Sequence, residues 1–74
     1  MPKLPRISGK EGVTILQLMG FMQMRQKGSP VIMRRADRGC VVPLHRELKV
    51  GTLAGLLRQA GVEPDDFTNA YQRR

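Results

Sequence analysis

The segment from Arg25 to Arg34 combines cationic side chains with a turn, which is a combination that can bind phosphate. It reads Arg-Gln-Lys-Gly-Ser-Pro-Val-Ile-Met-Arg, so that Gly28 and Ser29 lie between two stretches that carry cations. Lysine and arginine neutralise phosphates, and the backbone N–H groups of a Gly-Ser turn can form a small anion nest. Such turns are also common in hairpins. The segment therefore predicts a hairpin that could hold a phosphate group.

Positive charge continues beyond this hairpin. The chain has 13 lysines and arginines against six acids, a formal net charge of +7 in 74 residues, which favours a polyanion or an acidic protein as partner. A solvated sheet face is the alternative explanation. The three aromatic residues do not alternate with cations along a strand, so recognition of RNA by shape or backbone is expected. The expected RNA-binding residues are Arg25, Lys27, Gly28, Ser29, Arg34, Arg35 and Arg46.

Two further positions bear on catalysis. His45 is the chain's one histidine, and an imidazole can act as general base or acid near neutral pH. The favoured alternative is a loop residue that packs or caps the chain after a strand. Pro30, directly after the Gly-Ser turn, has no group that can move a proton. Cleavage of RNA without a metal needs a base, an acid and cations around the phosphate.

The single cysteine, Cys40, limits the possible chemistry and indicates a reducing cellular compartment. It cannot form a disulfide within the chain, and it lacks the Cys and His neighbours of a zinc site. We expect a small buried strand residue, no metal and no small-molecule cofactor. No run of about 18 apolar residues is present, so we expect a soluble, cytoplasmic protein with no membrane association.

The elements that position these residues follow from periodicity and capping signals. Ser8 and Glu11 have capping-box spacing, and an apolar stripe follows, which predicts a helix over residues 8–19. Alternation over residues 21–27 predicts a half-buried strand. A second strand is expected over 31–34, a turn over 35–39, and a third strand over 40–44 that Pro43 stops.

Two helices are expected after the strands. Leu53, Leu56, Leu57 and Ala60 fall at helical spacing between Thr52 and Gly61. Residues 63–71, with proline and acids in the first turn, predict a short final helix. This order predicts one α+β domain over residues 1–74, with two helices packed on one face of a three-stranded antiparallel sheet.

Four segments resemble those of the HicA toxin family in order and spacing, and together they cover nearly the whole chain. They are residues 3–11, 25–29, 42–45 and 51–61. The resemblance implies an α-β-β-β-α fold similar to the double-stranded-RNA-binding domain, with a short C-terminal helix. It also implies a toxin of a type II toxin–antitoxin system that cleaves mRNA without metal and is silenced by a HicB-like antitoxin. In that family the residue after Gly-Ser is the catalytic histidine, and here it is Pro30.

Three hypotheses follow from the residues and the resemblance. The chain is an endoribonuclease toxin, with Pro30 at the motif position and His45 as a substitute imidazole. Alternatively, it is an RNA-binding domain without catalysis, or a domain that mainly occupies an acidic antitoxin. RNA cleavage separates the first hypothesis from the second, and salt-sensitive RNA binding separates the second from the third.

Overall fold

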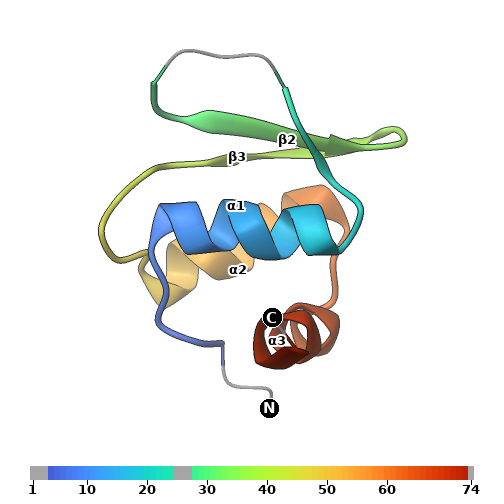
Figure 1. Cartoon of the computed structure of the whole chain (residues 1–74). Helices are drawn as coiled ribbons and strands as arrows, with labels where there is room; N and C mark the ends of the chain where they lie inside the picture. The colour runs from blue at the N-terminus through green and yellow to red at the C-terminus, as the bar shows by residue number, and fades with distance from the viewer. Residues whose placement is uncertain (1–3, 25–27, 74) are drawn as a thin grey trace.

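The computed structural model describes residues 4–24 and 28–73, which form a sheet with helices on one side. The elements in chain order are α1 (Gly9–Leu18), β1 (Met22–Gln23), β2 (Val31–Arg35), β3 (Arg38–Val42), α2 (Val50–Ala60) and α3 (Pro64–Arg73). Figure 1 shows α1 and α2 beneath one face of the sheet, with α3 on the side of α1 that is remote from the sheet. The expected α+β fold is confirmed, including two helices on one sheet face.

Helix α1 begins at the expected capping box. The Ser8 Oγ accepts a hydrogen bond from the Glu11 backbone N–H at 3.0 Å, and the Ser8 N–H donates to Glu11 Oε1 at 3.1 Å. The two bonds satisfy donors that a helix N-terminus otherwise leaves unpaired. Ser8 and Met19 are the caps of this helix. The predicted range of 8–19 is therefore confirmed to within one residue at each end.

Strands β2 and β3 form a tighter hairpin than expected. Arg35 pairs with Arg38, so only Ala36 and Asp37 form the turn, and β3 begins before Cys40. Ala36 has a φ of 55° and supplies the left-handed conformation that a two-residue hairpin needs. The prediction of a five-residue turn ending at Gly39 was wrong because it assigned that conformation to the glycine.

Strand β1 differs from the half-buried strand predicted over residues 21–27. Met22 pairs with Arg34 and Gln23 with Met33, and Met22 and Gln23 are both exposed. Of residues 21–24, only Phe21, which precedes the strand, is buried. Residues 25–27 lie outside the described part of the chain. The expectation of half burial fails because pairing with β2 directs Met22 to the side of the sheet that lacks helices.

The core lies between the sheet and the helices, as the apolar stripes predicted. Leu53, Leu56, Leu57 and Ala60 of α2 are all at most 4 % exposed, and α2 ends at Gly61 with a left-handed φ of 71°. Helix α2 begins two residues before Thr52, with Lys49 as an N-cap that makes no side-chain bond.

Helix α3 begins at Pro64, as its first-turn signals indicated, and extends two residues beyond the predicted end at Tyr71. Phe67 anchors it in the core with no exposed surface. Over residues 4–24 and 28–73, no helix has both the length and the apolar character needed to cross a bilayer.

Candidate nucleic-acid interface

The Gly-Ser turn closes onto the segment that follows β3. Ser29 Oγ accepts a hydrogen bond from the Leu44 backbone N–H at 3.0 Å. Val31 pairs with Val42, so this contact continues the alignment of β2 and β3 beyond the last backbone pair. Gly28 has a left-handed φ of 73°, which a glycine adopts without steric cost. The turn and residues 43–45 therefore lie side by side.

The first turn of α1 packs against the same segment. The Gly9 N–H donates to the His45 carbonyl at 2.9 Å. A Cβ at Gly9 would collide with the Pro43 carbonyl oxygen and would lie 2.7 Å from the Leu44 Cα. Only glycine allows α1 to come this close, so the backbone on both sides of Leu44 is fixed by contacts with two other segments.

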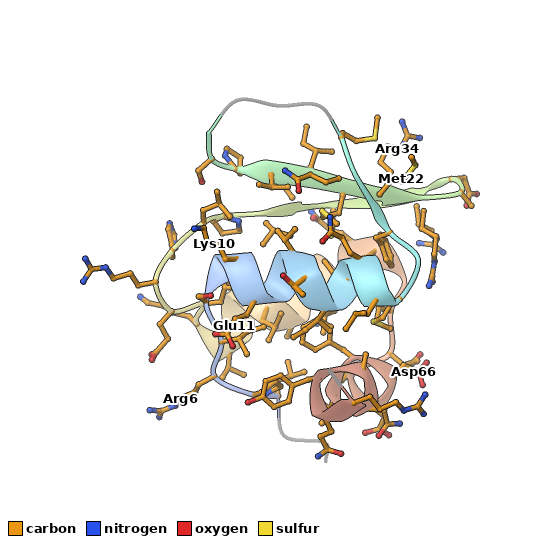
Figure 2. All side chains as sticks on the ribbon, viewed as in Figure 1. Arg6, Lys10, Glu11, Met22, Arg34 and Asp66 are labelled. Carbon is orange, nitrogen blue, oxygen red and sulfur yellow. The ribbon has the colours of Figure 1, made fainter. Side chains whose placement is uncertain are left out.

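These contacts gather three segments at one end of the sheet. We call residues 28–30, residues 43–45 and Lys10 the motif end. The residues of the turn, His45 and Lys10 are exposed there. Figure 2 shows Lys10 at this end of α1, facing the gap between the helix and the strands.

The motif end offers one imidazole, one ammonium group and exposed backbone, with a proline at the motif position. His45 is positioned through its carbonyl, which leaves its exposed side chain available to a ligand. Arg46 follows it and is also exposed. Within residues 4–24 and 28–73, no three side chains of His, Cys, Asp or Glu lie together as a metal-ligand set. The groups present can bind a phosphate, and an imidazole is a group that can serve as general base or acid.

Arg35 has structural contacts that the sequence did not indicate. Its Nη1 donates to the Met19 carbonyl at 2.9 Å, and its guanidinium carbon lies 4.6 Å from the centroid of the Phe21 ring. A cation at a helix C-terminus is favourable, as is a guanidinium over an aromatic ring. Arg35 therefore fastens the end of α1 to the sheet.

Arg34 lies on the other side of the sheet, among apolar side chains. It pairs with Met22 and with Gly39, and Figure 2 shows Arg34 beside Met22 at the end of the sheet remote from Lys10. We call the side of the sheet without helices the open face. Its large apolar side chains, 38–72 % exposed, are Met22, Met24, Ile32 and Val41.

The expected RNA-binding residues that the structure describes are thus distributed over different parts of the molecule. Gly28 and Ser29 lie at the motif end, Arg46 follows it, Arg34 is on the open face, and Arg35 packs on Phe21. Arg25 and Lys27 lie outside the described residues. The described side chains of the open face are mainly apolar.

Cys40 is a buried strand residue, as expected. It is 4 % exposed, and burial raises the pKa of its thiol to about 11. Desolvation disfavours the thiolate, so the thiol is protonated at neutral pH. The nucleophilic form of cysteine is absent under those conditions.

Sequence reasoning missed the contribution of α1 to this region. Lys10, Thr14 and Gln17 lie on one side of the helix at spacings of four and three residues, and all three are exposed. A polar stripe of this kind is normally a solvated helix face. Its proximity to the Gly-Ser turn depends on the Gly9 contact, which a pattern within α1 cannot indicate.

Comparison with known proteins identifies the family. A model of the family described as "HicA toxin of bacterial toxin-antitoxin" matches residues 9–62, which extend from the start of α1 to just beyond α2. No curated protein matches the chain, and no solved structure matches it.

Proposed function

The chain belongs to the HicA toxin family, and we propose that it binds RNA at the motif end while Pro30 limits cleavage. The observation that carries this proposal is the hydrogen bond from the Leu44 N–H to Ser29 Oγ. This bond holds the turn, and with it Pro30, beside the segment that carries His45. An exposed turn, a lysine and an imidazole then lie near one another, and such groups can contact a phosphate and its flanking ribose.

Cleavage of RNA at this end needs two proton transfers. A base removes the proton of the 2′-hydroxyl, whose oxygen attacks the phosphorus, and an acid protonates the departing 5′ oxygen. Pro30 can perform neither transfer, and an ammonium group such as that of Lys10 is a poor base. His45 is the remaining group suited to proton transfer there. The chain therefore binds its RNA substrate, for which mRNA is the candidate, and cleaves it slowly.

Replacement of the proline tests this proposal. Pro30→His places an imidazole at the motif position, and general acid–base groups typically contribute ~10²–10⁴-fold to a rate. Labelled RNA incubated without metal should therefore be cleaved faster by that factor. The rate should also change near pH ~6.5, where an unperturbed imidazole titrates.

The control is His45→Ala, made in both backgrounds. If the chain with Pro30 cleaves RNA as fast as Pro30→His, and His45→Ala abolishes that cleavage, His45 is the base and the role assigned to position 30 is wrong. If His45→Ala still cleaves RNA when position 30 is proline, a group outside the motif end is implicated.

Family membership also implies an antitoxin partner. We place this partner, a HicB-like protein, on the open face, because four large apolar side chains are exposed there around Arg34. Exposed apolar patches mark protein interaction sites, and the formal charge of +7 favours an acidic partner. This surface also supports the second candidate function, a domain that mainly occupies an antitoxin.

A further inference from the structure

A hollow of about 300 Å³ lies between α1 and the strands, next to the motif end. Its described lining residues are Lys10, Val13, Thr14, Gln17, Gln23, Val31 and Leu44. Leu44 is the residue whose N–H is bonded to Ser29, and Val31 directly follows Pro30. The hollow is therefore adjacent to the place where the proposed function puts a phosphate.

The pairing of the strands places Gln23 on the same side of the sheet as Val31. Gln23 pairs with Met33, and the Met24 N–H donates to the Ile32 carbonyl. Val31 lies two residues before Met33 on β2, so the side chains of Gln23, Met33 and Val31 are on the same side of the sheet. The hollow lies over Val31 on this inner side and is bordered by α1 and Leu44.

The hollow has an apolar floor and polar walls. Val13 and Val31 are 7 % and 5 % exposed and form the floor, while Gln17 and Gln23 are exposed. Neither carboxamide is hydrogen-bonded to another residue within the described part of the chain. Lys10 stands on the side toward the motif end, and none of the described lining residues is acidic.

A nucleobase complements this lining. Its flat face can lie on valine and leucine side chains, and its edge carries donors and acceptors that a carboxamide can match. Glutamine bonds bidentately to N6 and N7 of adenine, because its amide offers one acceptor and two donors. Lys10 can at the same time neutralise the phosphate attached to that nucleotide.

We propose that this hollow binds one base of the bound RNA, that adenine is its best complement, and that Gln17 and Gln23 set this preference. The proposal rests on the proposed function, since it assumes that RNA lies at the motif end. It adds a sequence preference that the turn, the cations and His45 do not provide, because they contact only the backbone and the ribose. The turn then fixes the position of a phosphate of the RNA, and the hollow selects the base.

Binding of short RNAs tests the proposal on the natural chain. Labelled 12-nucleotide RNAs of adenine, cytosine or uracil are titrated by fluorescence anisotropy, together with an adenine RNA that contains abasic positions. A good bidentate contact discriminates by about 5- to 150-fold, so adenine RNA should bind more tightly by such a factor. Gln17→Leu and Gln23→Leu should each reduce this preference and leave affinity for the abasic RNA unchanged.

Gln59→Leu is the matched control, because Gln59 is an exposed glutamine on α2 that does not line the hollow. It should retain the full preference, and thermal melting confirms that each variant is folded. If the natural chain binds every RNA, including the abasic one, equally well, the base site is refuted and RNA binding stands. If it binds none of them at low salt, the proposed function and the base site are both refuted.

Discussion

The open face and the motif end are both exposed, yet they are suited to different partners. The open face has large apolar side chains that are up to 72 % exposed, with Arg34 among them. At the motif end, the exposed groups are a Gly-Ser turn, a histidine and a lysine, held by hydrogen bonds to Ser29 and from Gly9. Apolar side chains gain most from contact with another protein, whereas a cation and exposed N–H groups suit a phosphate.

Under the proposed function, RNA and the antitoxin therefore bind different surfaces, which the net charge alone does not distinguish. A charge of +7 suggests one electrostatic surface for both RNA and an acidic antitoxin. The fold instead places the apolar residues on the side of the sheet without helices and the motif residues at the end of β2 and α1 (Figure 1). An antitoxin on the open face could then reach the motif end from the adjoining strand ends.

The largest expected effect comes from removing the core that supports both regions. Leu57 is 1 % exposed on α2, so Leu57→Ala should lower the free energy of unfolding by ~2–5 kcal/mol. A small domain has only ~3–5 kcal/mol of such stability, so most molecules should be unfolded at room temperature. Circular dichroism during heating measures this. A melting midpoint within a few degrees of the natural chain would contradict the assigned packing of α2.

Gly9→Ala should damage the motif end and spare the open face. The added methyl group would meet the Pro43 carbonyl, and overpacking of this kind costs ~1–3 kcal/mol. We expect α1 and residues 43–45 to move apart, with a lower melting temperature and weaker RNA binding. Antitoxin affinity, measured by calorimetry under conditions where the variant is folded, should fall much less.

Gly55→Ala is the matched control for that substitution. Gly55 lies within α2 with no atom near its added Cβ, so alanine should raise stability by about 0.5–1 kcal/mol. Two glycine-to-alanine changes in helices should therefore have opposite signs. Equal effects would mean that the contact between Gly9 and Pro43 does not constrain the motif end.

Val41→Lys distinguishes the two partners with a smaller effect. Val41 is 44 % exposed on the open face. A lysine there removes apolar contact with a protein, and it would add attraction for RNA only if RNA contacted this face. A HicB-family antitoxin should bind more weakly by about tenfold, which corresponds to ~1.4 kcal/mol, whereas RNA affinity should be unchanged. Calorimetry and anisotropy measure the two affinities.

Val50→Lys is its control, because Val50 is similarly exposed but starts α2 away from the open face. It should leave antitoxin binding intact. If Val41→Lys instead strengthens RNA binding well beyond Val50→Lys, RNA contacts the open face and the separation of the two surfaces is wrong.

The sequence was most informative where a contact is local. Ser8 and Glu11 are three residues apart, so their reciprocal hydrogen bonds could be predicted from spacing alone. The same holds for Gly61 at the end of α2 and for the buried leucine stripe. Each depends on helix geometry, which relates sequence distance directly to spatial distance.

Contacts between distant segments could not be predicted in this way. Arg35 and Met19 are joined across 16 residues and Leu44 and Ser29 across 15. Arginines 34 and 35 are adjacent in a cationic run, yet strand alternation sends them to opposite sides of the sheet. The hollow at Gln17 and Gln23 likewise arises from packing between segments, so no spacing within the sequence indicated it.

The bond between Leu44 and Ser29 makes the closure of the Gly-Ser turn a reversible local equilibrium. It is one exposed hydrogen bond to a side-chain hydroxyl, and such a bond contributes only about 0.5–1.5 kcal/mol net. This bond can therefore break while the backbone pairs of Val31 and Val42 stay intact. Opening belongs to the low-energy local fluctuations of a folded protein, so a ligand could exchange at this end while the core stays intact.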